Sequence, residues 1–131
     1  MKKTQYHVPD HIRAAYPDFI FHRSTDYLEE TEIITVMHCK GHAMAQVYWY
    51  HDQPKRVFLT HLVVEFPFRN RGLGLQLQQL REDIGRDRGA KWALLWVVKR
   101  SWMSKWYKRR GYRWHCKFDE EPKCMWMKKK L

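Results

Sequence analysis

The stretch RNRGLG, residues 69–74, combines the residue types that hold a phosphate group. It contains two arginines, Arg69 and Arg71, and two glycines, Gly72 and Gly74. A strand-like run precedes it and a helical pattern follows it, so backbone N–H groups would converge near the positive end of a helix dipole. Glycine lets the backbone approach a ligand closely, and arginine adds positive charge. The stretch therefore predicts an anion site.

Two common nucleotide-binding patterns do not fit this stretch. The dinucleotide fingerprint GxGxxG needs a third glycine where Leu77 stands, and the next apolar run ends in Lys99 and Arg100 where an acid would hold the ribose. The P-loop pattern, GxxxxGK followed by Ser or Thr, does not occur in the sequence. An ordinary strand-to-helix turn is the alternative to an anion site.

The charge of the whole chain also favours an anionic ligand. Lys and Arg number 25 against 14 Asp and Glu, which gives a formal net charge of +11. Such an excess indicates a polyanionic partner or surface, and it says nothing about the fold.

Cysteine and histidine spacing predicts neither a disulfide framework nor a metal site. The cysteines, Cys39, Cys116 and Cys124, are odd in number and form no CxxC pair. His38 and His42 flank Cys39 but lack a second ligand pair. No apolar run approaches the roughly 18 residues of a membrane span, and none of signal-peptide length follows the N-terminal lysines. We therefore expect a cytoplasmic protein without a metal or a membrane partner.

Three strands are expected before the glycine turn. Runs rich in β-branched and aromatic residues at 33–39 and 43–51 predict a hairpin, and 57–66 predicts a third strand. The first thirty residues are weakly patterned: 9–17 fits one or two helical turns, and Ser24 or Thr25 would cap a further helix.

A helix is expected directly after the turn. Its apolar face is formed by Leu73, Leu77, Leu80 and Ile84. Arg81 falls outside this face, among the polar residues. The helix would end near Gly85 or Gly89.

The rest of the chain completes a mixed sheet. Residues 92–98 predict a buried strand, 101–110 an amphipathic helix stopped by Gly111, and 112–118 and 123–129 two further strands. These elements predict a single α/β (α+β) domain over residues 1–131, with a mixed, mostly antiparallel sheet of about six to seven strands and helices on both faces.

The glycine turn and its surroundings resemble the acetyl-coenzyme A binding core of the GNAT superfamily of N-acetyltransferases. The resemblance lies in LVVEFPFRNRGLGLQLQQL, residues 62–80, and in WYKRRGY, residues 106–112. The family signature is Gln or Arg, two residues, Gly, one residue, then Gly or Ala, and Arg69, Gly72 and Gly74 match it. The resemblance extends over about residues 33–131. It implies an acyl-CoA N-acyltransferase fold with acetyl-CoA as co-substrate.

The second segment matches the downstream family pattern in part. Tyr107, Gly111 and Tyr112 stand where the family has its tyrosine and the following glycine–aromatic corner. Arg100 and Met103 stand where the family often has Asn and a small residue. The N-terminal region, which supplies two helices over the substrate in the family, is short here.

The resemblance implies a catalytic tyrosine and leaves the base open. Tyr107 would protonate the thiolate that leaves when an amine attacks the thioester. The alternative is that Tyr107 only packs in a core with Trp102, Trp106 and Trp114. His61 would remove a proton from the amine, since histidine titrates near neutrality, with Glu65 as the alternative base.

The coenzyme contacts also follow from the resemblance. Backbone groups of Leu62, Val63 and Val64 would lie along the pantetheine arm, and the amide near Val64 would polarise the thioester carbonyl. The remaining cofactor-binding residues would be Arg69, Asn70, Arg71, Gly72, Leu73, Gly74 and Arg100.

The acceptor is not identified by the sequence. An amine-bearing small molecule or protein is expected, and acidic stretches at 26–32 and 119–121 would border the substrate opening in the resembled fold. One alternative function is a basic nucleic-acid-binding module, suggested by the net charge and by KRSWMSKWYKRR, residues 99–110. Another is a catalytically silent protein of the same fold that binds coenzyme or a partner. Homodimer formation is left open.

Overall fold

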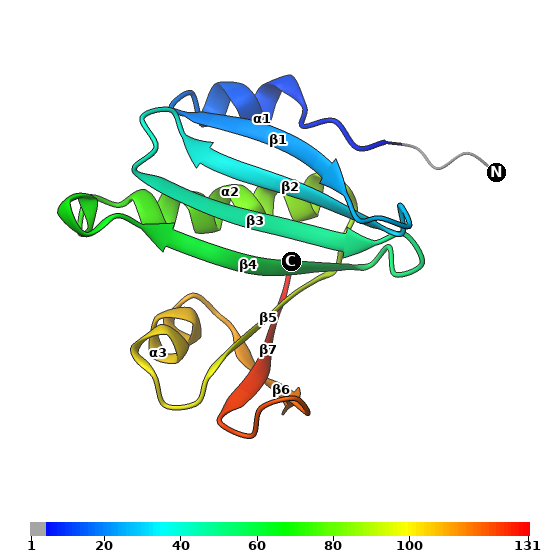
Figure 1. Ribbon diagram of the computed structural model, residues 1–131, viewed down its shortest axis with the longest axis vertical. Helices are drawn as coiled ribbons and strands as arrows, with labels where there is room; N and C mark the ends of the chain where they lie inside the picture. The colour runs from blue at the N-terminus through cyan, green and yellow to red at the C-terminus, as the bar shows by residue number, and fades with distance from the viewer. Residues whose placement is uncertain (1–4) are drawn as a thin grey trace.

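A computed structural model describes residues 5–131 as one seven-stranded sheet with three α-helices (Figure 1). The strands are β1 (Phe19–Thr25), β2 (Thr31–His38), β3 (Ala43–Tyr50), β4 (Arg56–Val64), β5 (Trp92–Val98), β6 (Arg113–Lys117) and β7 (Cys124–Lys130). The helices are α1 (Asp10–Ala15), α2 (Leu73–Asp87) and α3 (Trp102–Arg109), and a short 3-10 turn, η1 (Phe66–Phe68), follows β4.

The sheet is mixed, as the sequence predicts. Its strand order is β1-β2-β3-β4-β5-β7-β6, and only β4 and β5 pair in parallel. The predicted hairpin is confirmed as β2 and β3, while the third strand ends at Val64 rather than at residue 66. Of the two predicted ends of the helix, the one near Gly89 is confirmed, because α2 runs to Asp87 and Gly89 has a left-handed φ of 87°.

The N-terminal region differs from the sequence prediction. Ser24 and Thr25 do not cap a helix, since both belong to β1. The chain turns back into β2 because the Asp26 carboxylate accepts hydrogen bonds from the backbone N–H groups of Glu30 and Thr31, at 2.8 and 3.2 Å. The part of the chain before β2 that the structure describes therefore forms one six-residue helix and a strand.

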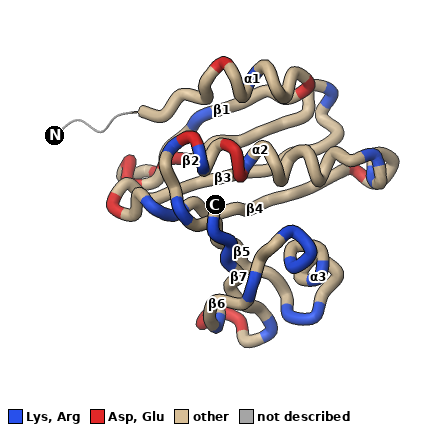
Figure 2. The backbone as a smooth tube through the Cα atoms, turned by 180° about the vertical axis from the view of Figure 1, so that it is seen from behind, with Lys and Arg blue, Asp and Glu red and all other residues tan. Residues whose placement is uncertain are grey.

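One face of the sheet carries the hydrophobic core. Val47 and Leu59, which alternate with outward residues along β3 and β4, belong to it. Ile12 of α1, Leu80 of α2 and Tyr107 of α3 join the same core. Where the sequence led us to expect helices on both faces, the described helices share this face. Figures 1 and 2 show α1 and α2 on it from opposite sides.

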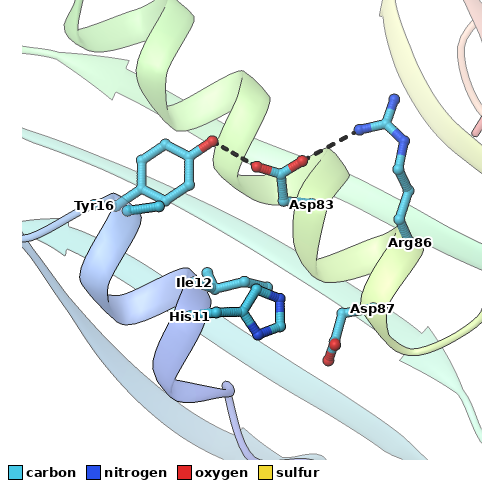
Figure 3. Close-up of a pocket in the computed structure, with 7 residues that line it drawn as sticks. His11, Ile12, Tyr16, Asp83, Arg86 and Asp87 are labelled. Atoms are coloured by element: carbon cyan, nitrogen blue, oxygen red, sulfur yellow. Dashed lines mark hydrogen bonds and ion pairs between the residues drawn. The ribbon is translucent and has the colours of Figure 1, made fainter.

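Helix α1 is attached to α2 through a polar contact at the edge of this layer. The Tyr16 hydroxyl donates to the Asp83 carboxylate at 2.6 Å, and Asp83 also accepts from Arg86 at 3.3 Å (Figure 3). Burial, followed by the bond to Asp83, raises the pKa of Tyr16, so the phenol stays protonated and donating. A pocket of about 440 Å³ lies beside this contact, between the two helices.

We expect Tyr16→Phe to lower the free energy of unfolding by about 1 kcal/mol, because it removes one half-buried hydrogen bond to a carboxylate. Urea denaturation measures the change. Tyr27→Phe is the matched control, since Tyr27 is 97% exposed. An equal effect of the two substitutions would show that the Tyr16 bond does not hold α1 in place.

Candidate active site

The parallel strands β4 and β5 separate and open the sheet at its centre. They pair only at their first residues, from Arg56 with Trp92 to Phe58 with Leu94. Beyond Phe58, β4 continues to Val64 with β3 on one side only, and Figure 1 shows β5 turning away from it. Backbone groups on the free side of β4 are therefore available to an extended ligand.

A β-bulge lies in this separated half of β4. Gln46 pairs with Thr60 and Met44 with Val63, so β4 carries one extra residue between these pairs. His61 is one of the two β4 residues between these pairs. Its φ is positive, at 53°, which is costly for a residue other than glycine. Such strain at the end of a strand often accompanies a functional site.

The predicted anion-binding turn follows β4 after the short 3-10 turn η1. Gly72, with a φ of 80°, is the N-cap residue of α2, and no side chain among the described residues caps this helix end. The first N–H groups of α2 lack intrahelical partners for the general reason that helices begin with unpaired donors. A Cβ at Gly72 would meet no atom within 4 Å, and one at Gly74 would meet Val64 at 3.8 Å, an ordinary contact. Packing within the chain therefore does not require either glycine.

The two arginines of the turn are exposed and held in different ways. Arg69 Nε donates to the carbonyl oxygen of Val64 at 3.1 Å, which joins the turn to the end of β4. The Arg71 guanidinium lies 5.4 Å from the ring centre of Phe68. Asn70, between them, is exposed and left-handed, with a φ of 65°, and Leu73 packs against the core.

Tyr107 is buried beneath the bulge and bonded to an arginine. Its hydroxyl accepts a hydrogen bond from Arg81 Nη2 at 3.1 Å. Arg81 Nη1 donates to the carbonyl oxygens of Thr60, at 3.2 Å, and Gln46, at 3.4 Å. One guanidinium therefore connects the tyrosine hydroxyl to the two strands at the bulge. Tyr107 also packs edge-on against Trp106, so the predicted site residue is a core residue as well.

Arg81 corrects the sequence prediction for α2. We expected it away from the apolar face, but it is fully buried. It belongs to a group of buried residues, here called the buried polar cluster, which consists of Gln78, Arg81, Glu82, Tyr107 and Tyr112. Gln78 accepts a hydrogen bond from Arg81. Its amide nitrogen donates to the Glu82 carboxylate and to the Tyr112 hydroxyl, both at 2.9 Å. The sequence signal that we missed is polar spacing: Gln78, Arg81 and Glu82 lie three and four residues apart, on one side of a helix.

Glu82, the acidic residue of the cluster, is paired with a cation and hydrogen-bonded. Tyr112 donates to Glu82 at 2.9 Å, and Lys129 of β7 forms an ion pair with Glu82 at 2.9 Å. Burial, followed by the negative charge of Glu82, raises the pKa of Tyr112, so this phenol remains a donor. The cluster thus ties α2 to α3, to the following corner and to β7.

The two candidate bases lie on the surface. His61 is exposed, with Nδ1 at 3.1 Å from the Thr60 hydroxyl. Glu65 is also exposed, and its carboxylate lies 4.0 Å from His42 Nδ1, where His42 stacks on Phe68. Leu62 and Val64 pack against the core, while Val63 between them is 51% exposed. The bulge thus places His61 beside the backbone segment expected along the pantetheine arm.

The two residues that depart from the family pattern lie in different environments. Arg100 is exposed and left-handed, with a φ of 59°, in the turn between β5 and α3. Met103 packs against the hydrophobic core. The next residue after Arg100, Ser101, caps α3 by accepting from the N–H of Ser104 at 3.1 Å.

The acidic residues expected near the substrate opening differ in their exposure. Asp119, Glu120 and Glu121 are exposed in the turn between β6 and β7. Glu32 is 1% exposed, since it accepts from the N–H of Tyr6 and pairs with Arg23. Glu32 therefore supports the N-terminal segment and does not line a substrate opening.

Several features that could define other kinds of site are not found in residues 5–131. Within this range no group of three or more His, Cys, Asp or Glu could hold a metal ion. His38 and His42 stack on each other, with ring centres 5.2 Å apart. No described helix has both the length and the apolar character to cross a membrane.

A second pocket of about 440 Å³ lies beside α2, lined in part by Gln79, Arg110 and Lys129.

Comparisons with known proteins give a fold-level match. No protein-family model matches the chain, and no curated protein sequence matches it. Among solved structures, a GNAT family acetyltransferase from Elizabethkingia anophelis with acetyl-CoA bound aligns with a TM-score of 0.64 and 14% identity, over 87% of this chain and 99% of that one.

Two further solved structures agree with this match. An acetyltransferase from Bacillus cereus aligns with a TM-score of 0.62 and 23% identity, over 82% of this chain and 80% of that one. The PaiA N-acetyltransferase from Thermoplasma acidophilum in complex with coenzyme A aligns at 0.62 and 14% identity, over 78% of this chain and 62% of that one. The chain has the acyl-CoA N-acyltransferase fold of the GNAT superfamily, which confirms the fold that the sequence resemblance implied.

Proposed function

We propose that this protein is an N-acetyltransferase that transfers the acetyl group of acetyl-CoA to an amine. The observation that carries the proposal is the junction of β4 and α2. There a bulged, one-sided strand end leads through η1 into an arginine–glycine turn and a helix N-terminus that no described side chain caps. The strand end offers hydrogen bonds to a pantetheine arm, and the helix end offers N–H groups to a pyrophosphate.

The glycines of the turn fit this role. The left-handed φ of Gly72 favours glycine by itself, whereas neither φ nor packing requires Gly74, so a ligand that approaches the backbone closely would explain Gly74. Arg69 and Arg71 are exposed beside them and would meet the pyrophosphate, with Asn70 and Leu73 contributing backbone groups. Arg100, in the turn after β5, would contact the coenzyme from the other side of the opening.

The proposed chemistry is direct acyl transfer. The amine nitrogen attacks the acetyl carbonyl carbon, the carbon–sulfur bond breaks, and the thiolate takes the proton of the Tyr107 hydroxyl. Arg81 donates to the Tyr107 oxygen, which leaves the O–H proton free to point at the sulfur. The backbone N–H near Val64 would stabilise the oxyanion that forms as the amine adds.

The ammonium must lose one proton to a base before attack, because a protonated nitrogen has no lone pair, and the nitrogen loses a second proton to a base as the adduct collapses to the amide. An alkylammonium with a pKa of about 10.4 is mostly protonated near neutral pH. His61 is the proposed base, because it is exposed at the bulge, beside the segment that would hold the thioester. Glu65 is the alternative base, one residue beyond the end of β4.

Substitution of the two glycines that flank α2 tests the proposed coenzyme site. Gly72 and Gly89 stand at the two ends of this helix, both with left-handed φ and with no atom within 4 Å of an added Cβ. Alanine at either position should therefore cost similar stability, about 1 kcal/mol. We expect Gly72→Ala to weaken acetyl-CoA binding by tenfold or more (about 1.4 kcal/mol), and Gly89→Ala to leave it unchanged.

The first test is whether acetyl-CoA raises the melting temperature of the unmodified protein. Isothermal titration calorimetry then measures the dissociation constant of acetyl-CoA for both variants. Absence of any coenzyme-induced stabilisation would contradict the proposed function. Equal affinities of the two alanine variants would contradict the placement of the pyrophosphate at Gly72. A panel of amines and peptides, assayed by release of free coenzyme A, would then identify the acceptor.

A further inference from the structure

The face of the sheet opposite the helices carries a continuous row of aromatic rings. The row, here called the aromatic face, consists of Tyr48, Tyr50, Phe58, Trp96, Phe118 and Trp126. Its successive ring centres are 5.0 to 5.8 Å apart, from Tyr50 to Phe58, Trp126, Phe118 and Trp96. The rings come from four strands and from the residue after β6.

The two ends of the row are open to solvent. Phe58, in the middle, is only 8% exposed, because its neighbours cover it. Tyr50 is 36% exposed and Trp96 is 48% exposed. Helices α1 and α2 lie on the other side of the sheet (Figure 1), so the rings at both ends of the row are accessible on the face that these helices leave uncovered. Exposed apolar surface of this kind marks an interaction site.

Positive charges lie on the same face. Lys128 lies two residues beyond Trp126 on β7, and its Nζ is 4.8 Å from the ring centre of Trp92. Arg56 lies two residues before Phe58 on β4. Burial, and then Lys128 and Arg56, lower the pKa of His115, which places both cations near this one imidazole.

Strands β3 to β7 contain no acidic residue, and the acids nearest the row in sequence lie in turns, with Asp52 two residues after Tyr50. Asp119, Glu120 and Glu121 follow Phe118 in the turn before β7. The chain as a whole has a net charge of +11. A partner that covers the face must therefore offer flat apolar groups and negative charge together, and a polynucleotide strand with unpaired bases does so.

We propose that the aromatic face binds single-stranded nucleic acid, with bases stacked on Tyr50 and Trp96 and phosphates held by Arg56 and Lys128. Base–aromatic stacking tolerates any sequence because every base has a π-face, so binding would be largely sequence-independent. This site is separate from the coenzyme site at the β4–α2 junction, and the proposal does not depend on acetyl transfer. It also differs from the basic run at 99–110, which belongs to α3 and its flanks.

Fluorescence anisotropy with a labelled single-stranded oligonucleotide of about 12 nucleotides tests the proposal. We expect binding to weaken as salt rises, and Tyr50→Ala and Trp96→Ala each to weaken it about 5- to 100-fold. Arg56→Gln should lower the slope of log K against log salt by about 0.7. Tyr27→Ala and Lys40→Gln are matched controls on other exposed turns and should change nothing.

Several results would overturn the proposal. One is the lack of oligonucleotide binding at low salt by the full-length protein. A second is loss of binding in Trp102→Ala but not in Trp96→Ala, which would place the site on α3. A third is equal affinity for a duplex of the same length, which would show that bases do not stack on the rings. Unchanged melting temperatures would show that each variant is folded, and Tyr107→Phe should bind the oligonucleotide normally.

Discussion

Replacing Arg81 by methionine is expected to lower the free energy of unfolding by about 3 to 5 kcal/mol. Arg81 is fully buried, and its guanidinium supplies the hydrogen bonds to the carbonyl oxygens of Thr60 and Gln46 and to the hydroxyl of Tyr107. Methionine fills a similar volume without a donor, so these buried acceptors lose their partner at about 1 to 3 kcal/mol each. Relief from burying a guanidinium offsets part of this loss.

Urea denaturation at neutral pH measures the effect, and Arg86→Met on the same helix is the control. Arg86 forms its ion pairs with Asp83 and Glu82 nearer the surface, with 46% of its side chain exposed. We expect that substitution to cost no more than about 1 kcal/mol. A similar, small loss in both variants would mean that the buried cluster does not organise the fold.

Replacing Tyr107 by phenylalanine is expected to reduce turnover by about 10² to 10⁴, once an acceptor is known, while acetyl-CoA still binds. The substitution removes only the hydroxyl that would protonate the leaving thiolate, and the ring keeps its contacts with Trp106 and Tyr112. Steady-state kinetics should show the loss in kcat rather than in the KM for acetyl-CoA.

Tyr112→Phe separates catalysis from stability in this comparison. Tyr112 is fully buried and bonds to Glu82 and Gln78 in the same cluster, but its hydroxyl has no proposed chemical step. We expect it to lose about 1 to 3 kcal/mol of stability with turnover nearly unchanged. If Tyr107→Phe behaves in the same way, Tyr107 is a packing residue and another group supplies the proton.

The local features of the coenzyme turn could be predicted because they depend on neighbours in the sequence. Residues 69–72 lie between the η1 turn that follows β4 and helix α2, which begins at Leu73, so the predicted order of strand, turn and helix is confirmed. Gly111 follows the end of α3 with a φ of 97°. The hairpin of β2 and β3 followed from alternating β-branched and aromatic residues. The turn at Asp26 did not, because a single carboxylate bonded to two backbone N–H groups replaces the expected helix cap.

The sequence by itself determined the glycine turn, the order of most elements and the positive charge, because each of these depends on residue type and local spacing. Only the tertiary structure decided that Arg81 is buried, that it links Tyr107 to the bulge of β4, and that the aromatic rings form one row across the sheet. These arrangements join residues far apart in the chain. Periodicity within one helix cannot distinguish a solvated arginine from a buried one whose terminal nitrogens donate to a distant tyrosine and two strand carbonyls.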